Sequence, residues 1–231
     1  MLKSSKSRLT PKQSAEFTGG TLFDKIARTV CRAGVLPAKE LYEAWEVARR
    51  VRRKYRGGRV VDLACGHGLL SHIMLLLDDS SPAAVAVDAN FPQSASAVSS
   101  AIIDAWPRLN GRIHFIETPI AGFEIGPDDL VMSIHACGTL TDCVLEKAVA
   151  ARARLAVLPC CHDIERSETG GLDGWLDGPL AVDVMRAARL KAAGYTVMTR
   201  TIPEEITPKN RLLMGHPENH DAMDGRGNEP E

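Results

Sequence analysis

Five short apolar runs alternate with longer helical patterns between residues 59 and 160, and this alternation restricts the fold more than any other feature of the sequence. The runs are RVVDLA (59–64), AAVAVDA (83–89), RIHFIET (112–118), DLVMSIHA (129–136) and RLAVLPC (154–160). Strands that are buried on both faces read as continuous apolar runs, and a strand–helix–strand order gives parallel pairing. The alternation therefore predicts a doubly wound α/β fold with a mostly parallel sheet.

The alternation stops after a last helical pattern over residues 182–194. Two further strand-like segments, YTVMTRTI (195–202) and RLLMGH (211–216), are joined by PEEITPKN, which has no helical pattern. A connection this short joins antiparallel strands, because a parallel crossover needs a dozen residues or more. The sequence thus predicts a seven-stranded sheet that ends in an antiparallel β-hairpin.

Four segments are expected along the chain. Residues 1–13 carry basic side chains among serines and a proline and are expected to form a flexible arm, while residues 14–57 hold two helical patterns and form a helical extension. Residues 58–217 are expected to be the α/β domain. Residues 218–231 have too few apolar side chains to bury and are expected to be a disordered tail.

Composition places the chain among soluble globular proteins. Of its 231 residues, 45% are hydrophobic and 25% are charged, and no uncharged stretch is long enough to span a membrane. The N-terminus lacks the apolar segment of a secretory signal, so the six cysteines are expected to be thiols in the cytoplasm. The net charge of -1 gives no reason to expect strong nonspecific binding of nucleic acid.

A glycine-rich segment, DLACGHG (62–68), follows the first apolar run. Small residues there allow a sharp turn and a close approach of a ligand, and the next helix presents its N-terminal amides. Twenty residues beyond Gly68 the second run ends in Asp88, where a carboxylate can accept hydrogen bonds from both hydroxyls of a ribose. The arrangement predicts a nucleoside cofactor.

S-adenosylmethionine fits this pattern better than a nicotinamide dinucleotide does. Nicotinamide dinucleotides favour G-x-G-x-x-G, but the aligned third glycine is Ser71 here. S-adenosylmethionine has no phosphate, so its site does not need that tight approach, and Asp62 supplies an acid for its positively charged end.

The combination of DLACGHG, VAVDAN (85–90) and a terminal hairpin resembles the class I S-adenosylmethionine-dependent methyltransferases, whose sheet is Rossmann-like. The resemblance covers about residues 58–217 and implies S-adenosylmethionine as cofactor. Ala64 stands where the family motif has its first glycine. The resemblance implies the following cofactor-binding residues: Asp62, Ala64, Gly66 and Gly68 at the methionine end, Asp88 with Asn90 at the ribose, and Glu117 at the adenine.

Two further motifs, HACGTLTD (135–142) and LPCCHD (158–163), follow the fourth and fifth runs. Together they resemble a narrower group of methyltransferase domains, whose animal relatives include one fused to a glutathione-transferase-like region. In the expected topology the carboxyl ends of the first, fourth and fifth strands face one crevice. The two motifs are therefore expected to line the acceptor site.

Four side chains of these motifs are candidate catalytic residues: His135, Cys137, Cys160 and His162. Either histidine can serve as a base, because an imidazole titrates near neutral pH. The cysteines suggest covalent catalysis or, alternatively, small buried packing residues. No metal site is expected, because adjacent Cys160 and Cys161 would point to opposite sides of an extended chain and no C-x-x-C pair exists.

Basic residues crowd the end of the second helical pattern, and four of them are candidates for binding RNA: Arg49, Arg52, Arg53 and Arg56. An alternative explanation is that acids at the start of this helix and bases at its end match the helix dipole.

These observations favour a cytoplasmic S-adenosylmethionine-dependent methyltransferase with RNA slightly preferred over a small metabolite as acceptor. Two alternatives stay open at this point: an NAD-dependent oxidoreductase, and a noncatalytic module that binds a cofactor or RNA.

Overall fold

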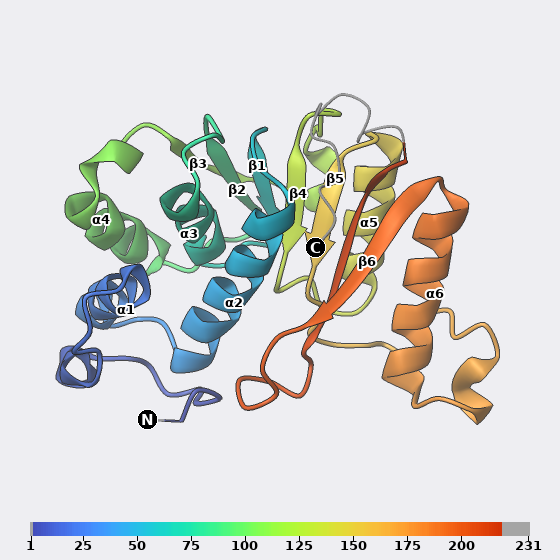
Figure 1. Cartoon of the computed structure of the whole chain (residues 1–231), viewed down its shortest axis with the longest axis horizontal. Coiled ribbons are helices and arrows are strands. Elements are labelled where there is room, and N and C mark those ends of the chain that lie inside the picture. The colour runs from blue at the N-terminus through green and yellow to red at the C-terminus, as the bar shows by residue number, and fades with distance from the viewer. Residues whose placement is uncertain (1, 219–231) are drawn as a thin grey trace, which may run out of the picture.

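The computed structural model describes residues 2–218. Within them a seven-stranded sheet has the order β3-β2-β1-β4-β5-β7-β6, and helices cover both of its faces (Figure 1). The strands are β1 (Val60–Leu63), β2 (Ala84–Asp88), β3 (Ile113–Glu117), β4 (Leu130–Ser133), β5 (Arg154–Val157), β6 (Tyr195–Thr201) and β7 (Arg211–Pro217). The α-helices are α1 (Leu22–Ala33), α2 (Ala38–Lys54), α3 (Leu69–Leu77), α4 (Ala95–Ala105), α5 (Thr139–Ala150) and α6 (Gly178–Ala192).

The predicted topology is confirmed. Strands β1 to β5 pair in parallel, and β7 pairs antiparallel with both β5 and β6. Strand β1 lies between β2 and β4, so the chain winds outward in both directions from this point. The carboxyl ends of β1 and β4 therefore border the crevice in which doubly wound sheets bind their ligands.

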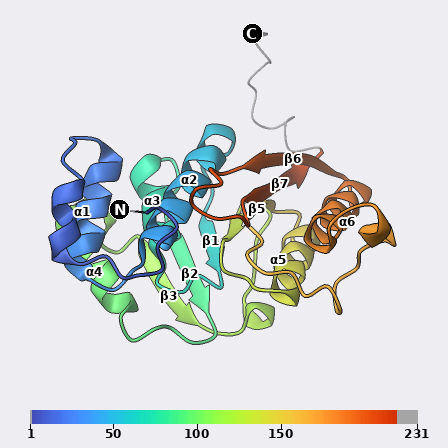
Figure 2. The same cartoon turned by 90° about the horizontal axis from the view of Figure 1, so that it is seen from below.

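Alternate residues of the central strands face two separate apolar clusters. Val60 and Leu130 pack with the side chains of α1, α2, α3 and α4 on one face, whereas Val61 and Val131 pack with α5 on the other. Figures 1 and 2 show α1 to α4 on one side of the twisted sheet and α5 and α6 on the other. Burial on both faces explains why these strands read as continuous apolar runs.

Strands β4 and β5 end earlier than their apolar runs suggested. Strand β4 ends at Ser133, whose hydroxyl accepts a hydrogen bond from the Ala136 amide at 3.2 Å. Strand β5 ends at Val157, shortly before Pro159, which has no amide hydrogen for sheet pairing. Cys137, Cys160 and Cys161 consequently lie in loops and not on extended strands, and residues 139–142 of the first motif begin α5.

The N-terminal segment is packed against the helices, which differs from the flexible arm expected for residues 1–13. Leu9 is only 1% exposed, and its amide donates to the Leu36 carbonyl at 2.7 Å. A short 3-10 helix (Pro11–Glu16) then leads to α1. Leu9 belongs to the same apolar cluster as α1, α2 and β1, so the helical extension shares the core of the α/β domain.

The expected C-terminal tail lies outside the described residues except for Glu218. In the part of the chain that is described, no helix combines the length and the apolar character that crossing a membrane requires.

Candidate functional site

The loop between β1 and α3 has an unusual backbone. Ala64, Gly66 and Gly68 all have positive φ angles, of 52°, 56° and 69°. The Gly68 amide donates to the Cys65 carbonyl at 2.9 Å, which closes the turn. A Cβ atom on Gly68 would lie 2.9 Å from the Phe115 ring, so a larger residue has no room there. The turn brings backbone amides to the carboxyl end of β1, as the motif predicted.

This loop is joined to Asp88 at the end of β2. The Gly66 amide donates to Asp88 Oδ2 at 2.9 Å, and the Asn90 amide donates to Asp88 Oδ1 at 3.2 Å. Each carboxylate oxygen retains lone-pair capacity for a further donor. Glu117 is the sheet-register partner of Asp88 on β3, and both Asn90 and Glu117 are exposed. The residues expected at the ribose and adenine therefore lie side by side.

Asp62 is fully buried in β1, next to the glycine loop. Its Oδ2 accepts a hydrogen bond from the Ser71 hydroxyl at 3.1 Å, whereas its Oδ1 has no hydrogen-bond partner among residues 2–218. Burial raises the pKa of Asp62 to about 7, and the nearby Asp88 adds to the effect. A buried carboxylate oxygen without a partner suits a cationic or hydrogen-bond-donating group.

His72 supports the loop from α3. Its Nδ1 lies 2.7 Å from the Gly68 carbonyl and must donate to it, and its Nε2 lies 3.2 Å from Ser99 Oγ. Burial lowers the pKa of His72 to about 4, so its imidazole is neutral at physiological pH. His72 is therefore a structural residue that orients the last carbonyl of the loop.

Helix α2 brings a carboxylate to the crevice that the sequence analysis did not single out. Glu40 Oε2 lies 3.7 Å from Nδ1 of His67, and His67 Nε2 lies 3.0 Å from Ser94 Oγ. Burial acts to raise the pKa of Glu40, but the nearby His67 and His135 bring it below its ordinary value. Only tertiary packing places α2 here, and local sequence carries no signal for it.

His135 lies on the other side of the same loop. A Cβ atom on Gly66 would be 3.9 Å from its Cδ2, so the imidazole borders the glycine loop. Burial lowers the pKa of His135, although the nearby Glu40 acts in the opposite direction. A neutral imidazole that faces the predicted cofactor position is suited to accept a proton.

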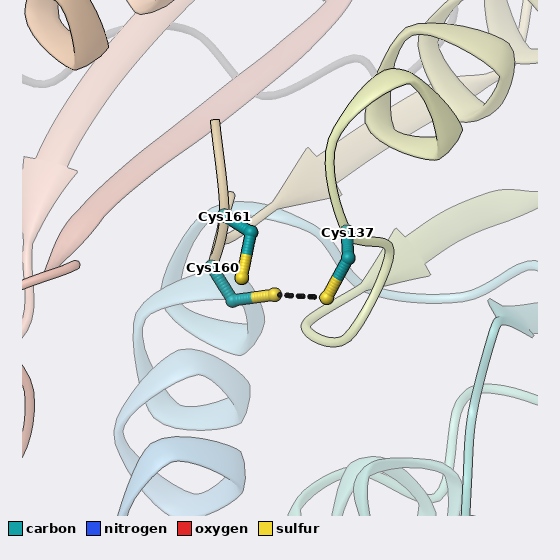
Figure 3. Close-up of side chains that lie close together, drawn as sticks. All are labelled: Cys137, Cys160 and Cys161. Atoms are coloured by element: carbon teal, nitrogen blue, oxygen red, sulfur yellow. Dashed lines mark hydrogen bonds between the residues drawn. The ribbon is translucent and has the colours of Figure 1, made fainter. Parts of the chain in front are cut away.

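Three cysteines meet in front of β4 and β5. The Sγ atoms of Cys137, Cys160 and Cys161 all lie within 4.8 Å of one another, and Cys137 Sγ is 3.0 Å from Cys160 Sγ (Figure 3). The expectation that Cys160 and Cys161 point apart is wrong, because this segment is an irregular loop and not an extended strand. Burial raises the pKa of Cys137 and of Cys160, so both thiols are mainly protonated and weakly nucleophilic at neutral pH.

His162 does not join the other candidates in the crevice. Its side chain is 1% exposed, and its Nε2 is 2.8 Å from Oδ1 of Asp183 on α6. Asp183 also binds Arg211 at 2.7 Å and Arg186 at 3.2 Å. The structure thus separates His162, which belongs to an ion-pair network, from His135 at the glycine loop.

The basic end of α2 divides into two faces. Arg52 is 4% exposed. Its guanidinium donates to the Met74 carbonyl at 3.1 Å and pairs with Asp78 at 3.3 Å, so the prediction that it contacts RNA is wrong. Arg56 is largely exposed but also pairs with Asp78 at 3.3 Å. The helical period turns Arg52 toward α3, away from Arg53, whereas Arg56 follows the end of α2 and reaches the same Asp78 from the next loop.

The other face of α2 lines a basic groove, a hollow of about 650 Å³ between this helix and the β-hairpin. Its charged and polar lining comprises Glu46, Arg49, Arg50, Arg53, Lys54, Arg200 and Thr201. A second cavity of about 590 Å³ lies between α6 and the hairpin and reaches Pro159, next to Cys160. Arg200 and Thr201 on the edge strand β6 line both hollows, which lie on opposite faces of the sheet.

Several solved structures with the same fold are described as methyltransferases. An O-methyltransferase family protein from Burkholderia thailandensis aligns over 92% of this chain and 65% of its own, with a TM-score of 0.53 and 21% identity. The B. subtilis M1A22 tRNA methyltransferase TrmK aligns over 79% and 70%, with a TM-score of 0.50 and 15% identity. Magnesium protoporphyrin IX methyltransferase (ChlM) from Synechocystis PCC 6803 with bound SAH aligns over 89% and 93%, with a TM-score of 0.50 and 13% identity.

Curated relatives match a shorter part of the chain. The glutathione S-transferase C-terminal domain-containing protein homolog of Drosophila melanogaster is 31% identical over 42% of this chain and 22% of its own length. The chain thus matches about a fifth of the length of that relative. A family model described as a methyltransferase domain matches residues 38–166, from the start of α2 to the loop after β5. The chain belongs to this family of methyltransferase domains.

Proposed function

We propose that this methyltransferase domain uses S-adenosylmethionine and transfers its methyl group to an RNA. The choice of cofactor rests on the contact between the glycine loop and Asp88, in which the Gly66 amide donates to Asp88 Oδ2 at 2.9 Å. The buried Asp62 Oδ1, which lacks a partner among the described residues, fits the ammonium end of the same molecule. The SAH in the ChlM structure supports the assignment.

The site fits a nicotinamide dinucleotide less well. In dinucleotide-binding loops the third glycine allows close packing of helix and strand. Ser71 occupies that position, is fully buried, and donates its hydroxyl hydrogen to Asp62. Replacing Ser71 by the glycine of the dinucleotide pattern would remove a hydrogen bond that Asp62 uses.

Each residue of the site has a defined part in the proposed reaction. When bound, S-adenosylmethionine supplies a methyl group that is already activated. Asp88 binds the ribose hydroxyls, the glycine loop lets the cofactor approach the backbone, and Asp62 faces the positive charge. His135 accepts the proton that the acceptor loses, and Glu40 stabilises the resulting imidazolium. The weakly nucleophilic thiols of Cys137 and Cys160 receive no covalent role in this proposal.

Calorimetric titration with S-adenosylmethionine, SAH and NAD tests the cofactor. Wild-type protein should bind the two sulfur nucleosides and not NAD. Asp88→Ala should weaken binding at least about tenfold, because it removes a charged acceptor of two hydroxyl hydrogen bonds. Asp104→Ala is the matched control, since Asp104 is exposed on α4, away from the loop. Binding of NAD alone, or equal binding by Asp88→Ala, would refute the assignment.

The basic groove supports RNA as the acceptor. Arg53 and Lys54 are exposed, and neither makes a side-chain hydrogen bond or ion pair within residues 2–218. Residues 49–54 lie about 14 to 21 Å along α2 from Glu40, given a rise of 1.5 Å per residue. A small metabolite in the crevice cannot reach them, whereas a polynucleotide with one nucleotide in the crevice is long enough to contact the basic groove. Phosphate contacts of this kind supply most nonspecific affinity for nucleic acid.

Charge reversal in the groove tests this proposal. The double variant R53E/K54E should weaken binding of total cellular RNA and reduce the dependence of log Kd on log salt by about two, one for each lost phosphate contact. Lys25→Glu on α1 is the control, because Lys25 is also exposed and lies outside the groove. Methyl transfer to RNA, measured with labelled cofactor, should fall in parallel. Transfer to small molecules only, with no effect of the double variant, would exclude RNA.

Two finer assignments are part of the same proposal. The match to the glutathione S-transferase C-terminal domain-containing homolog supports membership of the narrower group that has the HACG and PCCH motifs. All six cysteines are free thiols, which supports the reducing cytoplasm as the place of action.

A further inference from the structure

We infer that Cys137, Cys160 and Cys161 form a binding site for a thiophilic divalent cation such as Zn²⁺. The three residues come from two loops that are distant in sequence, after β4 and after β5. Their sulfur atoms are turned toward one another in Figure 3, and all three lie within 4.8 Å of one another.

The sulfur positions are close to those that zinc needs. A Zn–S bond of about 2.3 Å places two thiolates of a tetrahedral site about 3.8 Å apart. Small side-chain rotations are therefore sufficient to bring all three sulfur atoms to one ion. The backbone already holds the loops together, since the Gly138 amide donates to the Cys161 carbonyl at 3.1 Å.

The N-terminus of a helix lies beside the three cysteines. Cys137 lies two residues before α5, whose N-terminal amides carry partial positive charge. Binding of a metal ion releases the protons that the thiols hold in the metal-free protein. Soft thiolate ligands select zinc and related metals over magnesium or calcium. The site is thus suited in geometry and in ligand type to a soft cation.

The fourth position of such a site would be open. Cys137 and Cys161 are exposed, and His162, the next residue in the chain, is held by Asp183 and is not among the atoms within 4.8 Å. Zinc sites with three protein ligands keep the fourth position for water or an external ligand, whereas structural zinc sites have four protein ligands. The inferred site therefore offers one position to water or an external ligand.

Metal titration tests the inference without any measurement of methyl transfer, so its outcome is independent of the proposed function. Reduced, metal-free protein is titrated with Co²⁺, which gives a thiolate charge-transfer absorbance, and with Zn²⁺ against a chromophoric chelator. We expect one ion per chain. Serine substitution of any one of the three cysteines should weaken binding about 100-fold or more, since even indirect partners of a metal contribute 10–100-fold.

Cys143→Ser is the matched control, because Cys143 is an exposed cysteine on α5 outside the cluster. It should bind Zn²⁺ like the wild type, and circular dichroism of all four variants establishes that each is folded. Absence of saturable binding in the reduced wild-type protein would overturn the inference, as would binding that survives all three single substitutions. Formation of a Cys137–Cys160 disulfide by a protein that binds no metal when reduced would also overturn it.

Discussion

At the scale of single residues, we expect Asp62 to make the stability of the free protein depend on pH. Its carboxylate is fully buried, and only one of its oxygens has a hydrogen-bond partner in the described part of the chain. The pKa is raised from 3.8 to about 7, so the folded state holds this proton over a pH range in which the unfolded state releases it. A stabilising contribution that is complete below pH 4 is therefore lost as pH rises to 7.

Asp62→Asn should remove this dependence. Since one pKa unit corresponds to about 1.4 kcal/mol, the difference in unfolding free energy between variant and wild type should increase by about 4 kcal/mol, in favour of the variant, between pH 4 and pH 8. Urea unfolding of both proteins at several pH values measures this difference, in which the titrations of other groups cancel. A constant difference across the range would show that Asp62 titrates normally.

Gly66 and Gly68 have similar positive φ angles but different surroundings. An alanine at either position is strained by about 1–2 kcal/mol. At Gly68 the added methyl group also collides with Phe115 at 2.9 Å, whereas at Gly66 the nearest atom is His135 Cδ2 at 3.9 Å. Gly68→Ala should therefore lower the unfolding free energy more than Gly66→Ala does, by at least about 1 kcal/mol.

For S-adenosylmethionine binding we expect the opposite order. Relative to the unfolding free energy that each variant loses, Gly66→Ala should lose more cofactor affinity than Gly68→Ala. The methyl group of Gly66→Ala projects toward His135, into the proposed cofactor position, and should weaken S-adenosylmethionine binding more than tenfold in a protein that is still folded at 25 °C. Thermal melts and calorimetry on both variants separate the two effects. Normal cofactor affinity in folded Gly66→Ala would contradict this placement of the cofactor.

Sequence reasoning can place residues where local spacing decides their position, and the structure brings the glycine loop and Asp88 together. The glycine loop and Asp88 were recognisable because sharp turns and ribose binding restrict residue type at defined spacing. Glu40 and His67 were missed, because their proximity depends on how α2 packs over the sheet. Arg52 was assigned to the wrong environment for a similar reason, since nothing local indicates that Asp78 and the Met74 carbonyl bind it.

At the scale of elements, a buried arginine joins α5 to α6. Arg186 is fully buried, and its guanidinium binds Asp142 on α5 at 2.8 Å and the Gly138 carbonyl at 3.1 Å. It also lies 3.2 Å from Asp183, the partner of His162. The same side chain thus connects the start of α5, next to Cys137, with the loop after β5.

Arg186→Ala should lower the unfolding free energy by about 3 kcal/mol, because truncating one partner of a buried ion pair leaves the other uncompensated. Arg189→Ala is the control: Arg189 also binds Asp142, at 2.8 Å, but its side chain is 43% exposed, so the change should cost less than about 1 kcal/mol. Denaturant unfolding of both variants measures the difference. Equal losses of unfolding free energy in the two variants would show that burial does not increase the contribution of Arg186 to stability.

The strands were predictable as elements, but two of their ends were not. Apolar runs identify strands buried on both faces, which applies to β1, β4 and β5. The runs continue beyond β4 and β5 because the following loops are also partly buried, as Ile134 and Leu158 show. Side-chain direction after a strand ends depends on the loop backbone, and for this reason Cys160 and Cys161 were wrongly expected to diverge.

At the scale of the whole molecule, the helical extension and the α/β domain form one folded unit. The apolar cluster on one face of the sheet contains Leu9 and Phe17 together with the buried faces of α1 and α2. The segment also approaches the β6–β7 connection, where Lys3 pairs with Glu205 at 3.0 Å. That pair is exposed and contributes little to stability, so buried apolar side chains must hold the segment in place.

A substitution at Leu9 tests whether the N-terminal segment and the α/β domain unfold together. If the segment folds together with the rest of the molecule, Leu9→Ala should lower the global unfolding free energy by about 2–4 kcal/mol, as expected for a fully buried leucine. Leu2→Ala, at a residue that is 77% exposed, should change it by less than about 0.5 kcal/mol. Denaturant unfolding followed by far-UV circular dichroism measures both. Equal stability of Leu9→Ala and wild type would mean that the first residues detach before the core unfolds, and the segment would then be the independent arm that its composition suggested.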